Sequence, residues 1–150
     1  MIAKDSPKTF KVKVKRQDEA TSASYWQTFD VDYAPNMNVI STLQKIAAKP
    51  VTADGKDVAP VVWDCGCLEE VCGACTMVIN GRVRQACSTL VDELLEEASV
   101  IEIAPMSKFP VVRDLWVDRS RMFNNLQRIK GWVPTDGTYD LGAGPQETQE

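Results

Sequence analysis

Two runs near the start of the chain predict a pair of strands. Residues 10–15 alternate between apolar side chains and lysines, which is the period of two expected of a strand with one buried face. A second run, residues 25–33, places Tyr25, Phe29, Val31 and Tyr33 on a common face. The polar residues 17–24 between the two runs suit a connection of moderate length. We therefore expect an antiparallel hairpin.

The apolar period changes from Asn38 onward. Apolar side chains in residues 39–47 fall on one helical face, Asn38 is the expected N-cap, and Pro50 ends the segment. Residues 51–58 are polar and predict a loop, and residues 61–63 are strand-like. Asn80-Gly81 lies between two strand-like runs, residues 76–79 and 82–86, and is a strong signal for a hairpin with a type I′ turn.

A last short strand is expected at residues 99–103. Several short strands with one helix indicate an α+β domain of roughly 105 residues, with the helix across a mixed sheet. Beyond Pro110, the residues Leu115, Met122, Leu126 and Ile129 are spaced seven, four and three apart and predict an amphipathic helix that closes at Gly131 and Pro134. Residues 135–150 are rich in glycine and polar side chains and resemble a linker.

Composition narrows the function classes. The 150 residues carry a net charge of −4, so no excess of basic charge favours nucleic acid as a partner. The longest apolar stretch, residues 59–63, is far shorter than the roughly 20 residues of a membrane-spanning helix. The N-terminus is charged where a secretory signal would be apolar, so we expect a cytoplasmic location. The chain has no histidine, which removes imidazole as a base or metal ligand.

The five cysteines all lie between positions 65 and 87. Cys67, Cys72 and Cys75 have the spacing C-x4-C-x2-C, the plant-type pattern for a [2Fe–2S] cluster, and Cys87 follows after eleven residues. If Asn80 and Gly81 form the turn, Ile79 pairs with Arg82 and Cys75 with Ala86. Opposed residues of an antiparallel pair are about 4.5–5.5 Å apart, so Cys75 and Cys87 should be neighbours.

Two glycines of this segment fit a loop that wraps a cluster. Gly66 and Gly73 allow positive φ values and a close approach of amide groups that donate to sulfur. A disulfide, a thioredoxin-like pair at Cys72 and Cys75, and a structural zinc site are the alternatives, but each leaves part of the pattern unexplained. Cys65 fits no spacing and is expected to be a thiol beside the cluster.

The segments WDCGCLEEVCGACTMVINGRVRQAC and FPVVRDLWVDRSRMFNNLQRIKGWVP resemble the iron–sulfur subunit of succinate dehydrogenase or fumarate reductase. The resemblance implies a β-grasp, plant-type ferredoxin-like domain at 1–107, a helical extension at 108–134 and a linker at 135–150. It also implies a [2Fe–2S] cluster bound by Cys67, Cys72, Cys75 and Cys87, which takes electrons from an FAD-containing flavoprotein subunit for transfer to quinone.

The chain differs from the family pattern in two respects. Family members continue into a second cysteine-bearing domain, which would also contact membrane anchor subunits, whereas this chain has no cysteine after Cys87. We therefore expect an N-terminal fragment or a subunit whose second half is separate, peripheral on the cytoplasmic face of the inner membrane when assembled. The second departure is Cys65, although the x4 spacing favours Cys67 as the first ligand.

No catalysis is expected from this chain alone, because it has no histidine and no glycine-rich dinucleotide motif. Other readings remain open. The small iron–sulfur subunit of a molybdenum hydroxylase has similar cysteine spacing but lacks the PVVRDL to IKGWVP segment. A zinc or dithiol binding module and a stand-alone ferredoxin are further alternatives; an uncovered amphipathic helix argues against the last.

Overall fold

The computed structural model describes residues 8–131 and contains seven strands and three helices within them. In chain order these are β1 (Thr9–Arg16), β2 (Tyr25–Asp32), α1 (Val39–Ala48), β3 (Thr76–Ile79), β4 (Arg82–Gln85), α2 (Val91–Glu97), β5 (Val100–Ala104), β6 (Val111–Arg113), β7 (Trp116–Val117) and α3 (Ser120–Arg128). Contacts divide the chain into two units, Met1–Asp118 and Arg119–Glu150.

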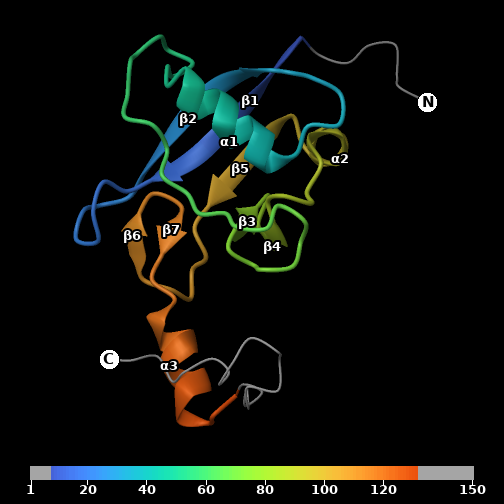
Figure 1. Cartoon of the computed structure of the whole chain (residues 1–150). Coiled ribbons are helices and arrows are strands. Elements are labelled where there is room, and N and C mark those ends of the chain that lie inside the picture. The colour runs from blue at the N-terminus through green and yellow to red at the C-terminus, as the bar shows by residue number, and fades with distance from the viewer. Residues whose placement is uncertain (1–7, 132–150) are drawn as a thin grey trace, which may run out of the picture. The chain divides into compact units, whose positions relative to one another are not determined.

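The first unit is built on a five-stranded mixed sheet of order β2-β1-β5-β3-β4. Strands β1 and β5 are parallel, and the other neighbours are antiparallel. Helix α1 lies across this sheet and contacts β2 (Figure 1). The predicted α+β class, the first hairpin and the helix across a mixed sheet are all confirmed.

The core lies between α1 and one face of the sheet. The inward residues of β1, beginning with Phe10, are buried in alternation with its lysines, and helix α1 contributes Val39, Leu43 and Ile46 to the same cluster. Asn38 caps the helix as expected, because its side-chain oxygen accepts a hydrogen bond from the backbone N–H of Ser41 at 2.8 Å.

Two expectations for the first unit are wrong in part. Residues 61–63 form no strand, because the N–H of Val62 donates to the side chain of Asp114 and its carbonyl accepts from the N–H of Leu115. The last strand of the sheet, β5, begins and ends one residue later than predicted.

The helix predicted from Leu115 to Ile129 begins only at Ser120. Leu115 is a buried core residue of the first unit, in the turn between β6 and β7, where Asp114 has a φ of +48°. Val111, Val112, Trp116 and Val117 on either side of it are β-branched or aromatic, which favours strands over a helix. The spacing of seven between Leu115 and Met122 is therefore not a helical repeat.

The β6–β7 hairpin belongs to the first unit, whereas the sequence placed the end of the cluster domain at residue 107. In the second unit, α3 has no buried residue, and Met122, Leu126 and Ile129 lie exposed in this chain. The division into a cluster domain, a helical extension and a linker stays a prediction, and the linker lies outside the described residues. Within residues 8–131, no helix is long and apolar enough to cross a bilayer.

Candidate iron–sulfur site

The β3–β4 hairpin has the register that the Asn80-Gly81 turn predicts. Ile79 pairs with Arg82, and φ is positive at both turn residues, +46° at Asn80 and +74° at Gly81, as a type I′ turn requires. One step beyond the strands, the N–H of Ala86 donates to the carbonyl of Cys75 at 3.1 Å. The hairpin therefore brings Cys75 and Cys87 together, as expected.

The other three cysteines lie on the segment Asp64–Ala74, which we call the cysteine loop. It has no regular secondary structure and is exposed over most of its length, including Leu68 and Val71, whose side chains are 51% and 81% exposed. Its shape depends on left-handed backbone at three residues, Leu68, Glu70 and Gly73, with φ near +62°, +61° and +72°. The cysteine loop therefore lies at the protein surface.

Backbone amides converge on the sulfur of Cys67. The N–H groups of Glu69, Val71 and Cys72 lie 3.4, 3.3 and 3.3 Å from it. These donors stabilise the thiolate, with Glu69 contributing most, and lower the pKa of Cys67 from its ordinary value to about 7. A thiolate is the form that binds iron, so the loop prepares Cys67 as a ligand.

Cys72 is the partner of Cys67 in this loop. Its sulfur accepts hydrogen bonds from the N–H groups of Cys67 at 3.3 Å and Ala74 at 3.4 Å, and its side chain contributes to the lowered pKa of Cys67. Gly66 lies against it, since a Cβ on Gly66 would lie only 3.0 Å from the sulfur of Cys72. Gly66 thus provides space, while Gly73 provides the positive φ that was expected of both glycines.

Cys75 and Cys87 form a second pair. Both are buried, and the bond from Ala86 to Cys75 keeps them near each other. Burial raises the pKa of Cys75, although amides of Cys87 and Ala86 act in the opposite direction. All five cysteines are free thiols, and Cys65 is exposed at the start of the loop.

The two pairs fit a two-iron cluster. Such a cluster is held by four cysteines, two on each iron, whereas structural zinc needs four ligands around one ion. In the described part of the chain, no three side chains of the usual metal-ligating types are placed to hold one ion. Amide donors to the ligand sulfurs are also a feature that tunes such clusters.

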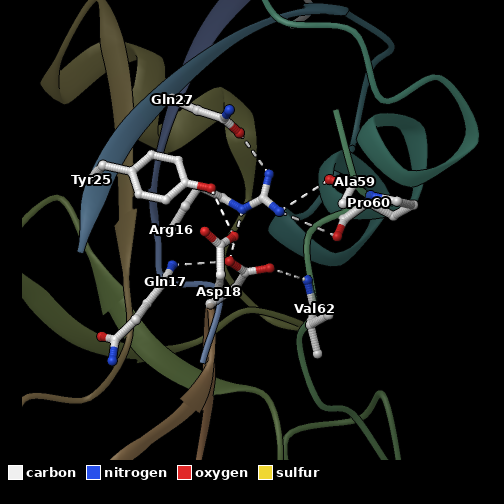
Figure 2. Close-up of polar contacts among 9 residues, drawn as sticks. Arg16, Gln17, Asp18, Tyr25, Gln27, Ala59, Pro60 and Val62 are labelled. Carbon is white, nitrogen blue, oxygen red and sulfur yellow. Dashed lines mark hydrogen bonds and ion pairs between the residues drawn. The ribbon is translucent and has the colours of Figure 1, made fainter. Parts of the chain in front are cut away.

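A buried ion pair holds the segment that leads into the cysteine loop. Figure 2 shows the guanidinium of Arg16 directed at Gln27 and at the carbonyls of Ala59 and Pro60, with Nη-to-oxygen distances of 2.6, 3.0 and 3.4 Å. Its Nε donates to Asp114 at 2.8 Å. The other carboxylate oxygen of Asp114 accepts from the N–H of Val62 at 2.9 Å.

The local sequence pattern does not identify this ion pair. The sequence does carry a signal for Arg16, because it lies on the same buried face of β1 as Phe10, Val12 and Val14. A charged side chain on that face needs a buried partner. No comparable signal marks Asp114.

The fold and the two thiol pairs define the class: a β-grasp iron–sulfur protein. The chain belongs to the family of 2Fe-2S iron-sulfur cluster binding domains, which matches residues 11–124. Its cofactor is accordingly a [2Fe–2S] cluster, and the match favours the cluster over the zinc and dithiol alternatives.

Curated relatives resemble the chain over most of its length. It is 54% identical to the succinate dehydrogenase iron-sulfur subunit of Bacillus subtilis over 93% of this chain and 54% of that protein. It is 32% identical to the fumarate reductase iron-sulfur subunit of Wolinella succinogenes over 81% of this chain and 48% of that protein. The chain thus spans about half the length of these relatives, whose names favour the predicted resemblance over a molybdenum hydroxylase subunit.

One solved structure shows the same fold. A chain of the Mycobacterium smegmatis Sdh1 complex in the apo form matches with a TM-score of 0.68 at 24% identity, over 97% of this chain and 55% of that one. At this identity the likeness supports the fold alone.

Proposed function

We propose that this chain transfers electrons as the iron–sulfur subunit, or as part of that subunit, of a succinate dehydrogenase or fumarate reductase. The ligands of its [2Fe–2S] cluster are Cys67, Cys72, Cys75 and Cys87. The observation that carries this assignment is the arrangement of these four thiols in two neighbouring pairs, Cys67 with Cys72 and Cys75 with Cys87, with three amides directed at the sulfur of Cys67. Cys65 stays outside the ligand set.

The protein's own residues have three tasks at this site. The amides of the cysteine loop stabilise thiolate charge, and Gly66 leaves room beside Cys72. The β3–β4 hairpin holds Cys75 and Cys87 close to each other. The bound cluster supplies one-electron redox chemistry. In this proposal, the oxidation of succinate belongs to a flavin-containing partner.

The exposed cysteine loop is the proposed contact with this FAD-containing flavoprotein subunit. Small residues at Gly66, Gly73 and Ala74 keep the layer between cluster and partner thin. Leu68 and Val71 project apolar side chains into solvent beside them, as an interface would use. We further propose association with membrane anchor subunits on the cytoplasmic face of the inner membrane.

Spectroscopy of the purified chain tests the cofactor and its type. We expect a brown protein with two irons and two sulfides per chain and an EPR signal that appears only on reduction. A colourless chain that binds zinc would overturn the proposal.

Hydrogen exchange with the flavoprotein subunit tests the interface. Amides of the cysteine loop should gain protection in the complex, while the strand residues 10–16 should exchange as in the free chain. Protection of the strand with an unchanged loop would place the interface on another face.

A further inference from the structure

The side chain of Asn38 joins the start of helix α1 to Cys87. Its Oδ1 accepts hydrogen bonds from the N–H of Ser41 at 2.8 Å and from the Ser41 hydroxyl at 3.0 Å. Its Nδ2 donates to the backbone carbonyl of Cys87 at 2.9 Å. The two ends of one amide thus serve two purposes, a helix cap on one side and a contact with a cysteine of the site on the other.

The backbone around this contact is fixed as well. Met37 accepts from the N–H of Val91 at 2.8 Å, and the N–H of Val39 donates to Thr89 at 3.1 Å. Residues 37–39 therefore run antiparallel to residues 89–91, with Asn38 opposite Leu90. Because α1 is packed on the sheet, Asn38 rests on a rigid element of the fold.

Cys87 lies in a turn after β4, which is closed by the carbonyl of Gln85. That carbonyl accepts hydrogen bonds from the N–H groups of Ser88 at 3.3 Å and Thr89 at 3.2 Å. The N–H of Ala86, the residue before Cys87, donates to the carbonyl of Cys75. Strand β4 ends at Gln85, so the regular strand hydrogen bonds stop before Cys87. The side-chain amide of Asn38 adds a hydrogen bond at the carbonyl of Cys87 itself. A ligand whose backbone is held in this way keeps its sulfur in a defined position.

We propose that Asn38 is a positioning residue for the cluster, acting through the backbone of Cys87. The inference rests on the ligand set proposed above. It assigns to the start of helix α1 a second role, which is to hold Cys87, the proposed ligand that lies farthest along the chain from the cysteine loop.

The chemistry of the N-cap position separates this role from helix capping. Asn, Asp and Ser cap helices about equally well, because each provides a side-chain oxygen acceptor. Neither an ionised Asp nor the shorter Ser can replace the amide donor to Cys87. Asn38→Asp and Asn38→Ser therefore keep the cap and remove the contact, one with an added charge and one without.

The experiment uses the full chain with its cluster and compares both variants with the native protein. We expect melting temperatures close to native, a changed EPR spectrum of the reduced cluster, and loss of the cluster to a chelator roughly two- to ten-fold faster, the effect of one neutral hydrogen bond. Ser41→Ala is the matched control, because it removes a bond to Oδ1 of Asn38 and leaves the bond to Cys87. It should release the cluster at the native rate.

Three results would overturn the inference. The first is native EPR spectra and release rates in both Asn38 variants, and the second is an equal acceleration in Ser41→Ala. The third is failure of both Asn38 variants to fold, since the side chain would then serve the fold and not the ligand. A native chain that carries no [2Fe–2S] cluster would instead contradict the proposed function, so the two failures are distinguishable.

Discussion

Arg16 and Asp114, 98 residues apart, form an ion pair with both side chains withdrawn from solvent. Nε of Arg16 lies 2.8 Å from Oδ1 of Asp114, and the side chains are 1% and 0% exposed. The same carboxylate accepts the N–H of Val62, two residues before the cysteine loop. The pair thus connects the end of β1, the β6–β7 turn and the start of the loop.

We expect Asp114→Asn to lower the free energy of unfolding by about 3–5 kcal/mol, because it leaves the buried charge of Arg16 without its partner. Urea unfolding at neutral pH measures this. The matched control is Glu102→Gln, which breaks the exposed pair of Lys13 and Glu102, 2.9 Å apart. That change should cost about 0–1 kcal/mol. Similar losses in the two variants would show that burial does not strengthen the Arg16 pair.

Replacing any one of Cys67, Cys72, Cys75 and Cys87 by Ala should abolish or strongly reduce the cluster, because four thiolates are needed to complete two irons. Cys65→Ala should keep it, since Cys65 is exposed and lies outside both thiol pairs. Absorption spectra with iron and sulfide analysis distinguish the variants. A colourless Cys65→Ala protein beside a brown Cys67→Ala protein would reverse the assignment of the first ligand.

Gly66→Ala should impair the site and leave the fold intact. Its Cβ would lie 3.0 Å from the sulfur of Cys72, so that sulfur must move by a few tenths of an ångström. We expect a lower cluster content or an altered EPR spectrum, with a nearly native unfolding midpoint.

Gly55→Ala is the control for Gly66→Ala, because it strains the backbone without crowding a neighbouring atom. At Gly55 a Cβ meets nothing within 4 Å, but the φ of +80° is strained for alanine. The expected cost is about 1–2 kcal/mol of stability, with an unchanged cluster. If Gly66→Ala only lowers the stability and leaves the cluster unchanged, then Gly66 is needed for the backbone conformation and not for the position of the Cys72 sulfur.

In the cluster-free chain, Cys67 should be the thiol most reactive toward iodoacetamide near neutral pH. Its pKa of about 7 lies below the ordinary 9.0, so the reactive thiolate forms as the pH rises through about 7 and is lost below it. Cys75 should react slowly throughout, because its pKa is raised and its side chain is buried. Rates measured by mass spectrometry of the labelled positions test this. A half-maximal rate for Cys67 near pH 9 would show that the loop amides do not stabilise its thiolate.

The sequence alone was sufficient for the features whose signals are local. Alternation in β1, the cap and stop of α1 and the Asn80-Gly81 turn each involve neighbours within a few residues, so the main hairpins and the helix were predicted correctly. The contact between Cys75 and Cys87 followed from the same turn, because a hairpin's register fixes which residues face each other. The ligand assignment still awaits the substitutions described above.

Tertiary structure decided the contacts between distant segments. Residue spacing suggested that Leu115 begins a helix, but its burial in the first unit and its hydrogen bond to Val62 override that local pattern. The partner of Arg16 and the link from Asn38 to Cys87 likewise depend on how separate elements pack. A single sequence carries no local signal for such pairs, because their hydrogen bonds form only after the sheet and helix α1 have brought the segments together.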